Sequence, residues 1–399
     1  MFNVFALAAC LQAPFYLHDG DRVTWYGDSI TEDGRYGAFV EMYVRTHLPK
    51  LEVRFTNSGW GGDRVSGGGG GPANVRIDQD FKPSNPTVVT VFLGMNDGGY
   101  VPWSADNDAA FATGYDKLIQ LMLAAAPKAR YTLLQTSPYD DFAHPSKSYN
   151  DVLLKMGVHV KELASKYKFD YVDLNEPLVN ALTQAARDDA QTAMRLVPDQ
   201  IHPQEAGHLL MAATLLKSWN APSLVSEVVI DSKTGDVKKS AGTKVSKTAA
   251  WEWKQTDEVL PMPINWGDPG VRLIADSAGI LDAIDDEMLT MTGLDSGSYS
   301  ISIDGKEVGK ASADDLGKGI NLAKLPTPMV IQAIQVGQLV LQKVQMNMFE
   351  WRQLRRTFNW TNNAAAGAKS LQGIEEELVK KAQATAVPTT HTFAISKVQ

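Results

Sequence analysis

The sequence predicts an α/β fold: a central parallel sheet with helices on both faces, followed by a smaller β-rich unit and C-terminal helices. Strand-like and helical segments alternate through residues 20–220, which is typical of βαβ units. Residues 87–93 (TVVTVFL) form an apolar run without alternation, as expected of a central strand that is buried on both faces. After about residue 225 the alternation stops, and Lys, Ser, Thr and Gly dominate residues 231–248.

The alternation defines a first segment, residues 20–225. Its strands are expected at residues 22–26, 51–56, 87–93, 131–135 and 171–174. Its helices are expected at residues 36–48, 107–126, 146–167, 176–193 and 204–219, where apolar residues recur at helical spacing. In a parallel sheet of this kind, ligands bind beyond the carboxyl ends of the strands.

Residues 226–326 are predicted to form a β-rich accessory unit. A strand is expected at residues 251–255 and a hairpin over residues 299–308. The hairpin contains Asp304-Gly305, and an Asp-Gly pair is a strong signal for a two-residue turn.

Residues 327–399 are predicted to be a C-terminal helical segment. A long helix is expected at residues 327–358 and a second one at residues 371–384. Pro328 stands near the start of the long helix, where a proline is tolerated because the first-turn N–H groups have no intrahelical partner.

Composition is that of an ordinary globular protein. The 399 residues are 44% hydrophobic and 21% charged, with a formal net charge of -8 and a pI near 5.4. This balance argues against a nucleic-acid partner, because phosphate binding favours a basic stripe. No apolar run reaches the length of about 20 residues that spans a bilayer, so no integral membrane segment is expected.

The N-terminal arm, residues 1–19, leaves localisation open. Residues 1–13 are apolar and resemble the tail of a secretory leader, although the positive region of such a leader is missing. Leu7-Ala8-Ala9-Cys10 resembles a bacterial lipoprotein cleavage site, and an ordinary apolar arm is the alternative. Because Cys10 is the only cysteine, the sequence excludes an internal disulfide framework and a zinc site built on paired cysteines.

Four short polar motifs stand where predicted strands meet loops. They are Gly27-Asp28-Ser29-Ile30, Asn57-Ser58-Gly59-Trp60-Gly61-Gly62-Asp63, Gly94-Met95-Asn96-Asp97 and Asp199-Gln200-Ile201-His202. The first three follow strands directly, so the fold brings them to one edge of the sheet. The fourth precedes a helix, and its loop must fold over that edge to join them. Together they supply the groups that a serine hydrolase needs.

Each group has an expected role. Ser29 is the nucleophile, and because a serine hydroxyl is weak without an adjacent base, His202 is expected beside it. Asp199, three residues earlier, lets one loop present both groups and holds the imidazole in the useful tautomer. The backbone N–H groups of Ser29 and Gly62 and the side-chain amide of Asn96 are expected to stabilise the oxyanion. Gly62 suits this role because a residue without Cβ lets the backbone approach a ligand closely.

Each motif alone has a simpler explanation. Gly-Asp-Ser is most often a turn, and Asp-x-x-His is usually a helix cap beside a surface histidine. The order and placement of all four favour a hydrolase. The sequence holds no H-E-x-x-H run, so a zinc hydrolase is not expected, and neither a metal nor a cofactor is predicted. It also lacks a G-x-S-x-G elbow, which counts against an α/β-hydrolase.

The four motifs resemble the four conserved blocks of the SGNH (GDSL) hydrolase superfamily, over about residues 20–220. Members are esterases, lipases, thioesterases and carbohydrate acetylesterases, and the resemblance implies a flavodoxin-like three-layer α/β/α fold. It assigns the same roles to the same residues. Gly62 is chosen over Gly59 and Gly61 because the family's glycine directly precedes an acidic residue, here Asp63. The segment after residue 225 has no clear counterpart in the minimal family fold.

Substrate contacts are expected from aromatic residues near the motifs. Trp60 lies inside the second motif and Trp103 follows the third, and indole faces suit a sugar ring or an aryl ester. Tyr139 falls at the same sheet edge. The glycine run at residues 67–71 is a flexible loop, a mobile rim that admits bulky substrates, or an anion cradle made by backbone N–H groups.

The expected function is hydrolysis of short-chain acyl esters, acetyl above all, through an acyl-enzyme intermediate, on plant polysaccharides or oligosaccharides. A small oxyanion site beside tryptophans, with an added β-rich unit, fits a glycan better than a lipid. The alternatives within the enzyme class are a broad-specificity carboxylesterase, a thioesterase and a lysophospholipase. The alternative of another class is a non-catalytic glycan-binding protein.

Overall fold

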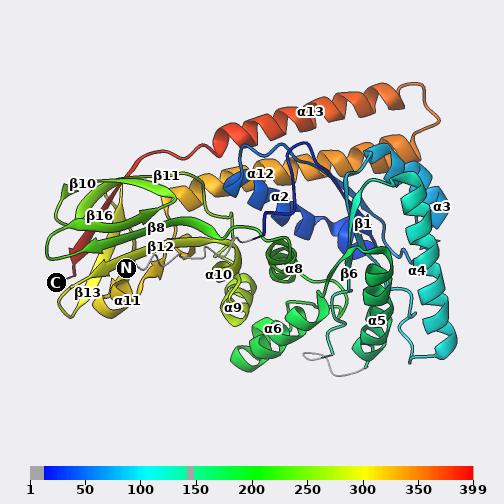
Figure 1. Ribbon diagram of the computed structural model, residues 1–399, viewed down its shortest axis with the longest axis horizontal. Coiled ribbons are helices and arrows are strands. Elements are labelled where there is room, and N and C mark those ends of the chain that lie inside the picture. The colour runs from blue at the N-terminus through cyan, green and yellow to red at the C-terminus, as the bar shows by residue number, and fades with distance from the viewer. Residues whose placement is uncertain (1–12, 142–147, 399) are drawn as a thin grey trace, which may run out of the picture.

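The computed structural model describes residues 13–141 and 148–398. Cys10 and the leader-like residues 1–12 lie outside the described residues, as do residues 142–147. The centre is a five-stranded parallel sheet with strand order β2-β1-β5-β6-β7 (Figure 1). Its strands are β1 (Arg22–Gly27), β2 (Arg54–Gly59), β5 (Val88–Phe92), β6 (Arg130–Leu134) and β7 (Asp170–Val172). This is the flavodoxin-like order, so the predicted fold class is confirmed.

Helices cover both faces of this sheet. In Figure 1, α2 (Arg35–His47) and α8 (Glu205–Ser218) lie on one side, and α4 (Ala105–Ala125) and α5 (Asn150–Tyr167) lie on the other. Further helices in this part of the chain are α1 (Ser29–Asp33), α3 (Ala73–Arg76), α6 (Asn175–Asp188) and α7 (Ala190–Ala193). The helix expected at residues 176–193 is broken at Asp189, because this side chain caps α7 by accepting the N–H of Thr192 at 3.0 Å.

The register of the sheet aligns the first two motifs. Gly27 at the end of β1 pairs with Gly59 at the end of β2 and with Phe92 at the end of β5. All five residues of β5 are buried, as the unbroken apolar run predicts. Full burial of each such valine contributes about 1.5–3 kcal/mol. The core therefore holds the carboxyl ends of the strands at one level.

Two further sheets follow, in the orders β15-β12-β8-β9 and β10-β11-β16-β13-β14. Their strands are β8 (Leu224–Asp231), β9 (Asp236–Ala241), β10 (Thr243–Ala249), β11 (Glu252–Asp257), β12 (Asp286–Thr292), β13 (Ser298–Ile303), β14 (Lys306–Ser312), β15 (Ile320–Asn321) and β16 (His391–Lys397). Short helices α9 (Pro269–Ala278), α10 (Ile280–Ile284) and α11 (Ala313–Lys318) connect them. The hairpin expected at residues 299–308 is confirmed, with φ of 52° at Asp304 and 76° at Gly305, as a type I′ turn requires.

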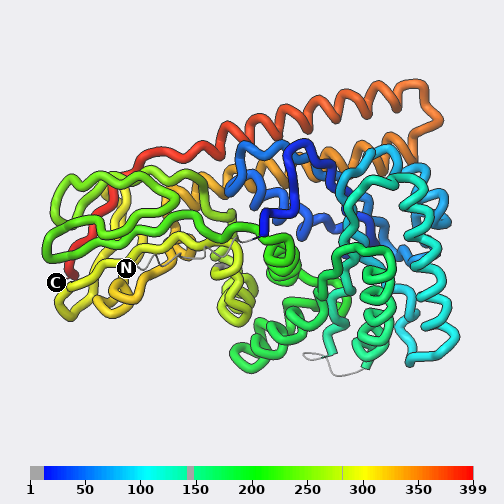
Figure 2. The backbone as a smooth tube through the Cα atoms, in the orientation of Figure 1, coloured from blue at the N-terminus to red at the C-terminus, as the bar shows by residue number. Residues whose placement is uncertain are grey.

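The C-terminal helices are α12 (Pro328–Phe349) and α13 (Ala364–Thr385), joined through the π-helical turn η4 (Glu350–Thr357). Thr327 caps α12 by accepting the N–H of Val330 at 3.1 Å, and Pro328 takes the first helical position as expected. Figure 2 shows α13 running back alongside α12 toward the β-rich end, where the chain closes with β16. The sequence did not predict β16, which pairs with β11 and β13.

The helix α12 joins the two hydrophobic cores of the molecule. Met329, Ala333 and Val336 in its first half belong to the core of the β-rich unit, whereas Val340 belongs to the core around the parallel sheet. The same helix covers the edge strand β2. Lys343 Nζ donates to the carbonyl oxygen of Phe55 at 2.6 Å, and Asn347 Oδ1 accepts the N–H of Asn57 at 3.1 Å. These side chains pair backbone groups that an edge strand otherwise leaves open.

Two buried carboxyl groups lie beneath the strand ends. Asp28 is fully buried; its Oδ1 accepts the N–H of Ile30 at 3.0 Å, and its Oδ2 has no hydrogen-bond partner among the described residues. Burial raises the pKa of Asp28 to about 7, and it raises the pKa of Asp97 to about 6. Both groups therefore keep a proton to a higher pH than a solvent-exposed carboxyl group does.

We expect Lys343→Met to lower the free energy of unfolding by about 3 kcal/mol, because Phe55 loses its donor and the buried Glu41 carboxylate loses the Lys343 ammonium at 3.1 Å. Urea unfolding of the variant and of the exposed control Lys369→Met measures this difference. Equal losses in both variants would contradict the role of α12 at the sheet edge.

We expect Asp28→Asn to flatten the pH dependence of stability. A carboxyl group whose pKa is higher in the folded than in the unfolded protein takes up a proton on folding. Its contribution to the free energy of unfolding is therefore full below pH 4 and declines toward pH 7, by up to about 1.4 kcal/mol per pH unit. Unfolding measured from pH 4 to pH 8, with the exposed control Asp188→Asn, tests this, and parallel curves for Asp28→Asn and the wild type would contradict it.

Candidate active site

Ser29 is presented at the start of a helix. Strand β1 ends at Gly27, Asp28 caps α1, and Ser29 is the first residue of that helix, where the sequence had suggested a loop. N–H groups in a first helical turn have no intrahelical partner, so that of Ser29 is free to bind a ligand. Gly27 is required by close packing, because a Cβ there would lie 2.7 Å from the carbonyl oxygen of Phe92.

The structure brings Ser29, His202 and Asp199 together in a hydrogen-bonded chain. Ser29 Oγ lies 2.8 Å from His202 Nε2, and His202 Nδ1 lies 2.5 Å from Asp199 Oδ2. Because a carboxylate only accepts hydrogen bonds, the Nδ1 atom carries the proton. The lone pair of Nε2 therefore faces the serine hydroxyl, which is the arrangement of a base next to a nucleophile.

The surroundings of Asp199 keep it ionised. Burial by itself raises the pKa of this carboxyl group, but hydrogen bonds from the backbone N–H of His202, from its ring and from the N–H of Ile201 outweigh burial. The net effect lowers the pKa of Asp199 below its usual range. An ionised Asp199 orients the imidazole and stabilises an imidazolium.

Tyr139 and Asp140 hold the loop that carries Asp199 and His202. The Tyr139 hydroxyl donates to Gln200 Oε1 at 2.9 Å, the N–H of Asp140 donates to the Gln200 carbonyl oxygen at 2.9 Å, and Gln200 Nε2 donates to the Asp140 carbonyl oxygen at 3.1 Å. Gln200 has a φ of 68°, in the left-handed region. Tyr139, a predicted substrate contact, is 6% exposed and contacts the loop.

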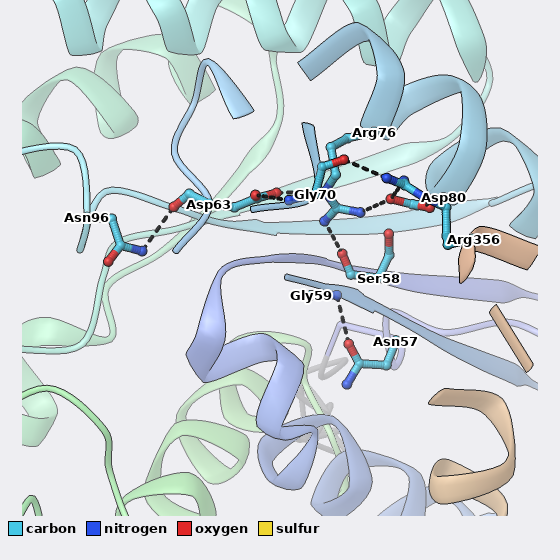
Figure 3. Close-up of polar contacts among 9 residues, drawn as sticks. All are labelled: Asn57, Ser58, Gly59, Asp63, Gly70, Arg76, Asp80, Asn96 and Arg356. Atoms are coloured by element: carbon cyan, nitrogen blue, oxygen red, sulfur yellow. Dashed lines mark hydrogen bonds and ion pairs between the residues drawn. The ribbon is translucent and has the colours of Figure 1, made fainter. Parts of the chain in front are cut away.

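Asn96 is held at both ends of its amide group. Its Nδ2 donates to the carbonyl oxygen of Asp63 at 3.0 Å, as Figure 3 shows, and its Oδ1 accepts from the Tyr100 hydroxyl at 2.8 Å. The contact ties the third motif to the second. An amide nitrogen carries two hydrogens, so one remains for a ligand. Sequence reasoning missed Tyr100, whose only signal is its position four residues after Asn96.

Gly62 is an exposed loop residue with a φ of 74°. A Cβ added there meets no atom within 4 Å among the described residues. In the protein without a ligand, glycine is therefore favoured at this position by the left-handed backbone conformation and not by close packing. The N–H of Gly62 has no hydrogen-bond partner in the described part of the chain.

The second motif is connected to the first by a backbone hydrogen bond. The N–H of Trp60 donates to the carbonyl oxygen of Gly27 at 3.0 Å.

The glycine run at residues 67–71 packs directly under the second motif. A Cβ on Gly68 would lie 2.5 Å from the carbonyl oxygen of Gly62, and a Cβ on Gly69 would lie 2.7 Å from that of Gly61. Close contact between two backbones thus explains the glycines. The structure shows this segment as a short hairpin, β3 (Gly67–Gly68) paired with β4 (Gly71–Pro72), that packs on the Gly61–Gly62 backbone.

The two candidate tryptophans differ in their surroundings. The Trp60 ring has three guanidinium groups against it, with those of Arg352, Arg356 and Arg76 at 4.4, 4.9 and 5.7 Å from its centre. The ring thus contacts cations of the protein itself. Trp103 is 44% exposed, with the ammonium of Lys155 4.4 Å from its ring.

His208, the second histidine near this loop, has a structural role. It is buried, stacks on Tyr36, and has Nε2 3.4 Å from Asp33 Oδ1. Burial lowers its pKa to about 4, so it is neutral at ordinary pH. Within residues 13–141 and 148–398, no three His, Cys, Asp or Glu side chains are grouped so that they could hold a metal ion.

Comparison with known proteins finds a matching family for the segment that holds the site. The model of the GDSL-like lipase/acylhydrolase family matches residues 25–210. An acetylxylan esterase from Geobacillus stearothermophilus is 24% identical over 219 residues, which are 50% of this chain and 93% of that protein. No helix in the described part of the chain is long and apolar enough to span a membrane.

Among solved structures, a gut microbial diltiazem-metabolizing enzyme is similar, with a TM-score of 0.79 and 24% identity, over 97% of this chain and 100% of that one. The fold over this span, which includes the β-rich unit and the C-terminal helices, therefore recurs there. The crystal structure of an acetylxylan esterase from Geobacillus stearothermophilus has a TM-score of 0.42 and 20% identity, over 51% of this chain and 96% of that one.

The span matched by the family model runs from β1 to α8 and contains all four polar motifs. An ester is the substrate that the family implies. Residues 25–210 thus match the GDSL-like lipase/acylhydrolase (SGNH) family, which is a family of esterases.

Proposed function

We propose that this esterase uses Ser29 to remove short acyl groups, acetyl foremost, from hydroxyl groups of plant polysaccharides or their oligosaccharides. The observation that carries the proposal is the chain of contacts Ser29 Oγ–His202 Nε2 (2.8 Å) and His202 Nδ1–Asp199 Oδ2 (2.5 Å). We assign the reaction to a hydrolase domain at residues 20–225, with residues 226–326 as an accessory unit and 327–399 as a C-terminal segment.

In the first step Ser29 Oγ attacks the ester carbonyl carbon while His202 Nε2 takes the hydroxyl proton. The negative charge that develops on the carbonyl oxygen is met by the N–H groups of Ser29 and Gly62 and by Asn96 Nδ2. Asp199 stabilises the imidazolium formed at this point. The tetrahedral intermediate then expels the alcohol, which takes its proton from His202 Nε2.

In the second step water attacks the acyl-serine. His202 Nε2 removes a proton from that water, the same donors stabilise the second oxyanion, and the acid leaves as Ser29 Oγ regains its proton. No cofactor takes part in this scheme. The neutral Asn96 amide suits this scheme, because one hydrogen is bonded to the carbonyl oxygen of Asp63 and the other remains for a ligand, without adding a charge.

The exposure of the catalytic loop supports a bulky alcohol group. The side chains of His202 and Asp199 are 42% and 51% exposed, so an ester on a large molecule can reach them. The relative from Geobacillus stearothermophilus is an acetylxylan esterase, which supports acetyl groups on a xylan-like glycan. Trp103, 44% exposed, is the tryptophan we propose for stacking on a sugar ring.

We expect the wild type to release acetate from acetylated xylan oligosaccharides and Ser29→Ala to lose at least about a thousandfold of this rate. The control Ser66→Ala, at an exposed loop serine, is expected to keep wild-type activity. Parallel assays use p-nitrophenyl acetate, a longer p-nitrophenyl ester, an acyl thioester and a lysophospholipid. Serine-dependent activity on those substrates alone would discard the glycan assignment, and full activity of Ser29→Ala would discard the mechanism.

We expect Asn96→Ala to lower kcat about a hundredfold to a thousandfold with little change in KM, because its amide acts on the oxyanion and not on the bound ester. Tyr100→Phe removes only the hydroxyl that holds Asn96 Oδ1 and is expected to lose less. Steady-state kinetics on p-nitrophenyl acetate measure both. A folded Asn96→Ala variant that keeps more than about a tenth of kcat would contradict the proposed donor role.

A further inference from the structure

The second motif is anchored by a buried arginine. Arg76 is 0% exposed; its Nε lies 2.6 Å from Asp63 Oδ2, its Nη2 donates to the carbonyl oxygen of Ser58 at 2.5 Å, and its Nη1 pairs with Asp80 (Figure 3). Asp63 also accepts, through its backbone oxygen, the hydrogen bond from Asn96. Arg76 and Asn96 therefore hold the same residue, which directly follows Gly62.

The chain of contacts continues into the C-terminal segment. Arg356 Nη1 lies 2.8 and 2.7 Å from the two carboxylate oxygens of Asp80, and Arg356 Nη2 donates to the carbonyl oxygen of Gly70 at 2.6 Å. Asp80 is 6% exposed, and its carboxylate contacts the guanidinium groups of both Arg76 and Arg356. Gly70, in turn, donates its N–H to Asp63 Oδ1 at 3.3 Å. Arg356 is therefore connected to Asp63 in two ways: through Asp80 and Arg76, and through Gly70.

The same helical turn, η4, also contacts α1, the helix that begins within the first motif. Arg352, four residues before Arg356, pairs with Glu32 of α1, the helix that begins at Ser29. The guanidinium groups of Arg352 and Arg356 both lie against Trp60, which precedes Gly61 and Gly62. One turn of the C-terminal segment therefore contacts both the helix that begins at Ser29 and the residue two positions before Gly62.

Loss of Arg356 changes the charge beneath that site. Asp63 and Asp80 carry two negative charges that Arg76 and Arg356 balance, and without Arg356 the two buried carboxylates share the single positive charge of Arg76. The Gly70 carbonyl also loses its donor. The glycine run touches the Gly61–Gly62 backbone, so a shift of this run moves the N–H of Gly62. Oxyanion donors act only within a narrow range of distance, and a displacement of about 1 Å costs about a hundredfold in rate.

We infer that Arg356 is a positioning residue for the oxyanion hole, and that the C-terminal segment thereby completes the active site without supplying a reacting group. The inference rests on the proposed function of Ser29, Gly62 and Asn96. It assigns a catalytic purpose to residues that the family's hydrolase domain does not include, since the family model ends at residue 210.

The test compares Arg356→Gln and Arg356→Lys with Arg355→Gln. Arg355 lies in the same turn but pairs with Glu350, away from Asp80, and is the matched control. With p-nitrophenyl acetate we expect kcat to fall about tenfold to a hundredfold in Arg356→Gln, with KM within about twofold of the wild type. Arg356→Lys keeps a positive charge for Asp80 but cannot contact Asp80 and the Gly70 carbonyl oxygen together as the guanidinium group does. We expect its kcat to lie between those of the wild type and Arg356→Gln. Arg355→Gln is expected to match the wild type.

Two further readouts separate positioning from general structural damage. A trifluoromethyl ketone, which forms a tetrahedral adduct with an oxyanion, is expected to bind Arg356→Gln more weakly by the same factor as kcat, whereas an ester-like ground-state inhibitor binds equally. Exogenous guanidinium is expected to restore part of kcat to Arg356→Ala but none to Ser29→Ala. Wild-type kcat in folded Arg356→Gln, or equal weakening of both inhibitors, would overturn this inference and leave the proposed function of Ser29 intact. Full activity of Ser29→Ala would instead overturn the proposed function on which the inference rests.

Discussion

A buried guanidinium is the interaction on which the active-site edge of this protein depends. Arg76 has no exposed surface, and its planar group reaches the carboxylates of Asp63 and Asp80 and the carbonyl oxygen of Ser58 together. Removing one partner from such a buried pair typically costs about 3–5 kcal/mol, because a charge is left without compensation. The second motif, the glycine run and the C-terminal turn are therefore constrained as one body around this residue.

The parallel sheet supplies the other constraint. Pairing of Gly27 with Gly59 and with Phe92 places the ends of β1, β2 and β5 at one level, and the first three polar motifs lie at these ends. The edge strand β2, which leads into the second motif, is covered by Lys343 and Asn347 of α12. A helix that the chain adds after the β-rich unit thus stabilises the strand that positions Gly62. The appended segments and the hydrolase core act on each other through packing, not through a flexible linker.

Local chemistry made several elements predictable. The apolar run of β5, the Asp304-Gly305 turn and the Thr327-Pro328 start of α12 each follow from residues within a few positions, and the structure has them where expected. Contacts distant in sequence were not predictable in this way. Strand β16 pairs with β11 and β13, far along the chain, and its own residues alternate only weakly between buried and exposed. Trp60 looked like a sugar platform because its motif gives no sign of Arg352 and Arg356.

The sequence by itself determined the α/β class, the resemblance to a hydrolase family and the choice of Ser29, Asn96, Asp199 and His202 as candidates, because short motifs at strand ends carry that information locally. Only the tertiary structure decided that Ser29 Oγ lies 2.8 Å from His202 Nε2 and that the glycine run supports Gly62. It alone placed Arg356, 276 positions after Asp80, on that carboxylate. Such pairings depend on how the chain folds back on itself, and burial of compensating charges, which no local pattern encodes, selects them.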